Sequence, residues 1–249
     1  SYTITYTDAA SISLAPSDIT LVKTGTANGV VSVSGSGNTT RTVTISSITG
    51  DGTLGISLAP GTADDNTCNT APAAVASTTT SVDNTLPTIA ISAPSASLTM
   101  SGAVTYTVSY TGASAVTLNP SDITLNTSGT ATGIISVTGS GTSTRTVTIS
   151  SITGDGTIGI SIGAGSAIDT ANNNAPAAGP SATFLVDNTA PTLSISAPST
   201  SLTNAGPVTY TITYTGADSI LLAPGLVTLN TTGTANGTIN VLGSGTGTR

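Results

Sequence analysis

Apolar side chains alternate with small polar ones along most of the chain. In the clearest stretch, Val104, Tyr106, Val108 and Tyr110 are separated by single threonine or serine residues. Because successive side chains of a strand point to opposite faces, this alternation predicts one buried and one exposed face. The same spacing predicts strands around residues 89–91, 116–118, 123–125, 135–137, 147–149, 158–162 and 184–186. Glycine- and proline-containing turns separate them about every ten residues, which is typical of an all-β domain.

The whole pattern repeats with a constant offset of 104 residues, without insertion or deletion. The offset is clearest at Tyr2, Tyr106 and Tyr210, and at Arg41, Arg145 and Arg249. A repeat of this length is one domain, so we expect tandem immunoglobulin-like β-sandwiches of about seven or eight strands each, arranged as beads on a string. The predicted domains are residues 1–84 (a partial repeat without its first strand), 85–188 (complete) and 189–249 (a partial repeat without its C-terminal strands). The chain is therefore expected to be part of a longer polypeptide.

The composition narrows the classes of function. Charged residues make up only 6% of the chain, and the net charge of −7 with a pI near 4.1 argues against a nucleic-acid partner. No apolar run in these residues is long enough to span a membrane, and one cysteine allows no internal disulfide framework. The mean hydropathy of +0.29 is high for a chain with so few charges, which indicates that neighbouring domains, chains or glycans cover part of the surface.

Catalytic chemistry has no candidate residues. The chain contains no histidine and no glutamate, and its glycine-rich segments lie between predicted strands rather than before a helix. We therefore expect a protein that is not an enzyme. An isopeptide crosslink in every repeat is also excluded, because Lys23 is replaced by Thr127 and Thr231 at the equivalent positions.

Three segments resemble a known family. Gly154–Thr157 precedes a strand, Asp169–Asn173 follows it, and Val186–Thr192 lies at the domain junction. They are similar to the D-x-A-G-N loop and the V-D-x-T-A-P-T junction of the bacterial immunoglobulin-like repeats found in large surface adhesins and extracellular fibres. The first repeat departs from the loop pattern at Thr67 and Cys68. The resemblance implies a secreted or surface-anchored protein, located extracellularly, whose junctions often carry calcium.

Candidate calcium ligands recur at fixed positions of the repeat. They are Asp65, Asn69 and Asp83 in one repeat and Asp169, Asn173 and Asp187 in the next. Calcium takes six to eight oxygen ligands, mainly from carboxylates and carbonyls. Asp169 is expected to face the linker of the preceding domain and pair with Asp83, or each group binds separately; alternatively, these side chains only cap turns.

Other recurring residues have simpler interpretations. We expect Arg145 to form an ion pair with Asp122 or Asp155 of its own domain, the alternative being a contact between domains or chains. The spacing of Tyr106 and Tyr110, and of their equivalents, places the rings in the core rather than in a sugar-binding surface.

The sequence thus favours a structural protein that forms an extracellular fibre or rod on the bacterial cell surface. Its expected partners are neighbouring copies of itself, laterally or end to end, and the cell surface or matrix. The first alternative is the spacer stalk of a large calcium-rigidified adhesin whose binding domain lies elsewhere. The second is a set of repeats that bind glycan or protein multivalently.

Overall fold

The computed structural model describes all 249 residues, and its regular elements are β-strands and short 3-10 turns, without an α-helix. Three 3-10 turns interrupt the strands: η1 (Pro16–Asp18), η2 (Pro120–Asp122) and η3 (Pro224–Leu226). The chain divides into two compact units, Ser1–Val186 and Asp187–Arg249, and the first unit contains two repeats of the same strand pattern. The fold is therefore a tandem array of β-sandwich domains, as the alternation and the repeat predict. The boundaries at 84/85 and 188/189 stay predictions.

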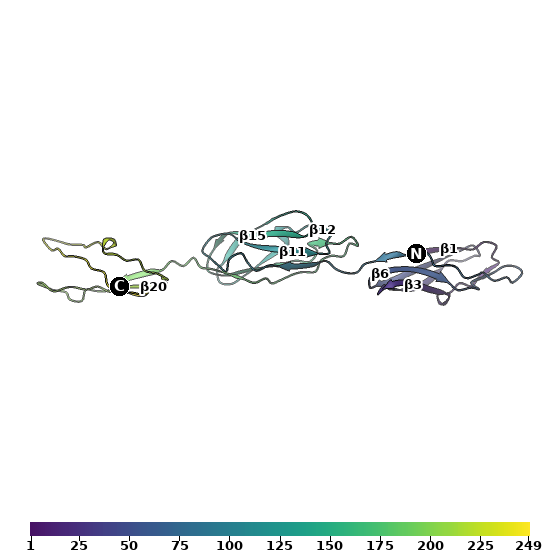
Figure 1. Cartoon of the computed structure of the whole chain (residues 1–249), viewed down its shortest axis with the longest axis horizontal. Coiled ribbons are helices and arrows are strands. Elements are labelled where there is room, and N and C mark those ends of the chain that lie inside the picture. The colour runs from purple at the N-terminus through teal and green to yellow at the C-terminus, as the bar shows by residue number, and fades with distance from the viewer. The chain divides into compact units, whose positions relative to one another are not determined.

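The second repeat contains two four-stranded sheets. Its strands are β9 (Thr88–Ile91), β10 (Leu98–Thr99), β11 (Val104–Thr111), β12 (Ala115–Val116), β13 (Ile123–Thr127), β14 (Thr132–Thr138), β15 (Thr144–Thr153), β16 (Gly156–Ile162), β17 (Ala167–Ile168) and β18 (Phe184–Val186). One sheet has the order β14-β15-β11-β9 and the other β10-β18-β16-β13, while β12 pairs with β17. Only the β10–β18 pair is parallel, and Figure 1 shows β11 beside β15 within this repeat. The sequence does not predict the short strands β10 and β17, because two residues are too few for a visible alternation.

The core of the second repeat lies between these sheets. The burial of β11 alternates as its sequence predicts, with Val104, Tyr106 and Val108 fully buried. Tyr106 contacts Phe184 of the opposite sheet with ring centroids 6.5 Å apart. The Tyr106 hydroxyl donates to the carbonyl of Ala182 at 2.9 Å, so its polar atom is satisfied inside the core. The prediction that the tyrosines pack internally is confirmed for this repeat.

The first repeat has the corresponding strands. They are β1 (Tyr2–Thr5), β2 (Ser11–Ile12), β3 (Ile19–Gly25), β4 (Asn28–Ser34), β5 (Thr40–Thr49), β6 (Gly52–Leu58), β7 (Ala63–Asp64) and β8 (Thr80–Val82). Its sheets have the orders β1-β5-β4 and β3-β6-β8, with β2 paired to β7. A separate cluster of buried residues, centred on Val43 and Ile56, forms its core. Each of the two repeats therefore has its own core.

Glycine is required in the turn that leads into β16. Gly156 has a φ of +140°, and a Cβ atom there would collide with the carbonyl of Ser128. Gly52, at the same position of the first repeat, has the same φ and the same obstruction by Thr24. The Gly-Asp-Gly segments are therefore turns between strands, as predicted.

The unit Asp187–Arg249 contains a two-stranded antiparallel sheet of β19 (Thr192–Ile195) and β20 (Ile212–Thr215). The main chain of Ile212 also exchanges hydrogen bonds of 2.9 and 3.0 Å with Arg249. Tyr210 is 53% exposed in this unit, although its counterpart Tyr106 is buried. The prediction of an internal tyrosine is therefore wrong at this position, because no strand of the unit supplies the opposite sheet that β16 and β18 form in the second repeat.

Candidate functional site

The predicted ligand Asp169 begins the loop that follows β17. Its Oδ1 accepts hydrogen bonds from the amides of Ala171 and Asn173, each at 2.8 Å, and its Oδ2 accepts one from Asn173 Nδ2 at 2.8 Å. These bonds favour the ionised carboxylate, and the Asn173 side chain is the main reason that the pKa of Asp169 is lowered. Asp169 and Asn173 thus form one hydrogen-bonded unit.

The first repeat builds the same loop from Asp65 and Asn69. Asp65 accepts hydrogen bonds from the Asn69 amide at 2.9 Å, from Asn69 Nδ2 at 2.9 Å and from the Thr67 amide at 2.7 Å. The contacts with Asn69 are the main reason that the pKa of Asp65 lies well below its usual range. Cys68 is a free, exposed thiol in this loop and has nearly the same positive φ as its counterpart Asn172, 66° against 67°.

The loop of the second repeat contacts the linker that precedes it. Asn173 Nδ2 donates a hydrogen bond of 2.9 Å to the main-chain carbonyl of Asp83. The structure therefore brings Asp169, Asn173 and Asp83 together, with the loop against the preceding linker. The Asp83 carboxylate accepts a hydrogen bond from the Thr85 amide at 3.1 Å, and Asp187 makes the same contact with Thr189 at 3.0 Å.

The oxygen types at this junction are those that calcium takes. They are the Asp169 carboxylate and the Asp83 carbonyl, both of which accept from Asn173 Nδ2 in this structure, and the carboxamide oxygen of Asn173. No group of three or more acidic, histidine or cysteine side chains lies together in the structure. A calcium ion here would therefore need water or further main-chain carbonyls to complete its six to eight ligands.

A second contact at the junction is not evident from the sequence. The Asn84 amide donates to Asp51 Oδ1 at 2.6 Å, and Asn84 Nδ2 donates to the Gly50 carbonyl at 2.6 Å. Both acceptors belong to the Gly-Asp-Gly turn of the first repeat, which the sequence indicates only as a turn. The available signal is that this turn and the Val-Asp-Asn segment recur in the same 104-residue register.

The arginines bind within their own repeats, but not in the way predicted. Arg145 is 9% exposed, and its guanidinium donates to the main-chain carbonyls of Thr144 at 2.8 Å and Val116 at 2.9 Å. Arg41 makes the equivalent bonds to Thr40 and Ile12. Hydrogen bonds to carbonyls therefore take the place of the expected ion pair, because the guanidinium lies against the main chain of β12 and β15.

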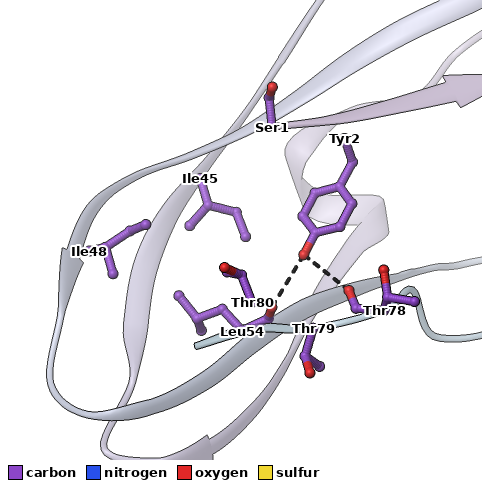
Figure 2. A pocket seen from close by; sticks show the side chains of 8 residues that line it. All are labelled: Ser1, Tyr2, Ile45, Ile48, Leu54, Thr78, Thr79 and Thr80. Atoms are coloured by element: carbon purple, nitrogen blue, oxygen red, sulfur yellow. Dashed lines mark hydrogen bonds between the residues drawn. The ribbon is translucent and has the colours of Figure 1, made fainter. Parts of the chain in front are cut away.

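The first repeat has a cavity beside its core tyrosine. It measures about 290 Å³ and is lined by Ser1, Tyr2, Ile45, Ile48, Leu54, Thr78, Thr79 and Thr80 (Figure 2). Thr80 stands at the position that Phe184 occupies in the second repeat. Tyr2 keeps the role of Tyr106, since its hydroxyl donates to the carbonyls of Leu54 at 3.2 Å and Thr78 at 3.3 Å (Figure 2). No acidic or basic side chain lines the cavity, so we interpret it as a packing difference between the repeats.

Comparisons with family models, with curated proteins and with solved structures find no match for this chain. The structure contains no helix with the length and apolar character needed to cross a membrane.

Proposed function

We propose that this chain is a structural, non-enzymatic protein whose tandem immunoglobulin-like repeats form an extracellular fibre or rod on the bacterial cell surface. Its partners are neighbouring copies of itself, side by side or end to end, and the cell surface or matrix. The array of β-sandwiches in a constant register supports this proposal, because tandem copies of one domain supply length and repeated contact surfaces.

The observation that carries the proposal is an uncharged edge strand in each of the two repeats. β4 and β14 each end a sheet, and each has seven residues without a charge or a proline. Val30 and Ile134, at the same position of these strands, are 59% and 62% exposed. Edge strands normally carry charges or prolines that prevent pairing with another chain. A bulge precedes Val30 and Ile134, but the residues that follow keep a regular register.

Calcium at the junction is part of this proposal. Asp169, Asn173 and the Asp83 carbonyl would hold the ion, which would supply positive charge between the linker and the following repeat. Chelation is then expected to remove the contribution of the ion and leave the hydrogen bonds of the junction in place, and electron microscopy in calcium and in chelator measures the effect.

The spacer stalk of an adhesin is the alternative. The stalk is favoured over multivalent binding, because aromatic and arginine side chains, which commonly form binding surfaces, lie inside the domain. Tyr106, Tyr110 and Arg145 are all buried in the second repeat. The stalk would use the same repeats without contact between chains.

A charged edge tests the fibre proposal against the stalk. We expect Val30→Lys combined with Ile134→Lys to reduce association of the chain in sedimentation velocity, because lysine on an edge strand opposes pairing. The control is Thr107→Lys, an exposed position on β11, which is flanked by strands on both sides. Equal association of the edge variant, the control and the unmodified chain would exclude these edges as the contact surface.

A further inference from the structure

The turn that receives Asn84 is held in one conformation by its own repeat. The Asp51 amide donates to Thr26 Oγ1 at 2.9 Å, and the Asp51 carbonyl accepts from the Thr26 amide at 2.8 Å. Gly50 has a φ of +73°, and a Cβ atom there would collide with the Thr26 carbonyl. The acceptors of Asn84 are therefore held in place by contacts within the first repeat, independently of the linker.

The loop that receives Asp83 is fixed in the same way. Asn173 Nδ2 has two hydrogen atoms, and it donates to both Asp169 Oδ2 and the Asp83 carbonyl. Asp169 in turn accepts from two amides of its own loop. The Asn173 side chain is therefore held in the orientation that reaches the linker.

The two contacts meet at a single peptide group. The carbonyl of Asp83 and the amide of Asn84 belong to the same peptide bond. A trans peptide is planar, and its C=O and N–H point in opposite directions. The first repeat thus binds one side of this peptide through Asp51, and the second repeat binds the other side through Asn173.

We propose that the Asp83–Asn84 peptide is a two-sided latch that fixes the angle between these repeats by hydrogen bonds, without metal. A rotation of the linker here breaks a bond to one of the repeats, and the bond to Asp51 is strengthened by the carboxylate charge. Beyond the latch, Pro87 restricts the linker through its fixed φ. Asp51 and Asn173 are therefore positioning residues. The inference goes beyond the proposed function, because it applies to a single chain whether or not chains associate.

Pulsed electron–electron double resonance tests the latch on the full chain. Spin labels are attached at Thr20→Cys and Thr124→Cys, two exposed and equivalent positions, in a Cys68→Asn background that removes the native thiol. All samples contain a chelator, so calcium makes no contribution. We expect a single narrow distance distribution for this protein, and loss of the single peak in Asp51→Ala, which removes the acceptor of the Asn84 amide, and in Asn173→Ala.

The control is Asn38→Ala, which removes an exposed amide from the turn between β4 and β5 and is expected to leave the distribution narrow. Circular dichroism verifies that each variant is folded. A narrow distribution in both latch variants would overturn the proposal, as would a broad distribution in the parent protein that narrows only on addition of calcium. Neither outcome depends on association between chains, which is measured separately.

Discussion

Replacement of Phe184 by threonine tests the packing account of the repeats. The change gives the second repeat the residue that the first repeat has at Thr80. Phe184 is 1% exposed and contacts Tyr106 at a centroid separation of 6.5 Å. The expected effect is a loss of stability confined to the second repeat, with a cavity like that in Figure 2.

The magnitude follows from the burial of the ring. Truncation of a buried phenylalanine to alanine costs about 3–5 kcal/mol, including the cavity that remains. An aromatic pair adds about 0.5–1.5 kcal/mol beyond its buried area. Threonine fills part of the space but brings a hydroxyl that needs a partner, so we expect a loss of about 3 kcal/mol for Phe184→Thr. This is smaller than the total stability of a typical domain, roughly 5–15 kcal/mol, so the repeat is expected to stay folded.

Native-state hydrogen exchange is the appropriate assay, because a global transition would combine several domains. Amides of β11, β15 and β16 report on the second repeat, and amides of β5 and β6 report on the first. The control is Leu185→Thr, at a neighbouring position that is 47% exposed, with an expected loss below about 1 kcal/mol. A loss below about 1 kcal/mol for Phe184→Thr, or an equal loss in the first repeat, would refute the reasoning.

Three further changes test individual contacts. The pKa of Asp169 is lowered in the folded state, so its stabilising contribution is present above the pKa of an unfolded aspartate and is lost as the pH falls through the folded value. The protection of the Asn173 amide from hydrogen exchange, relative to its intrinsic exchange rate at each pH, should therefore fall in acid. This fall should be absent in Asp169→Asn. Arg145→Lys is expected to lower the free energy of unfolding in urea by about 1–2 kcal/mol, because a lysine ammonium cannot reproduce the two hydrogen bonds that the planar guanidinium donates to two carbonyls. An unchanged unfolding midpoint would contradict a stabilising role of these hydrogen bonds. Gly156→Ala is expected to destabilise the second repeat, because Gly156 has a φ of +140° and a Cβ atom there would collide with the Ser128 carbonyl. Gly141→Ala, whose Cβ atom would meet no atom within 4 Å, should lower stability less. Equal losses of stability in thermal unfolding would contradict the steric argument.

The strands and the core of the second repeat can be predicted because alternation is a local property. In β11, the side chains of Val104, Tyr106 and Val108 face inward simply because every second residue does so. Burial of Tyr210 does not follow from the same alternation, because it also requires an opposite sheet. Nor can alternation place Arg145, whose partners are carbonyl groups that carry no sequence signal.

The junction is only partly predictable. The placement of Asp169 and Asn173 in one loop follows from their short separation, but the sequence leaves open whether that loop meets the preceding linker, binds separately or only caps a turn. The contact of Asn84 with Asp51 does not follow from the sequence, because it joins a turn and a linker that are 33 residues apart and depends on how the sheets bring them together. Residue types alone indicate a turn at Asp51, and they do not indicate what the turn binds.

Electron microscopy of four consecutive repeats, beginning at the position of Pro87, tests the central claim most directly. Images are recorded in calcium and in chelator at the same protein concentration. The account predicts straight rods that bundle or join end to end in calcium, with looser association between rods in chelator. Dispersed single rods at every concentration would contradict the fibre and favour the spacer stalk.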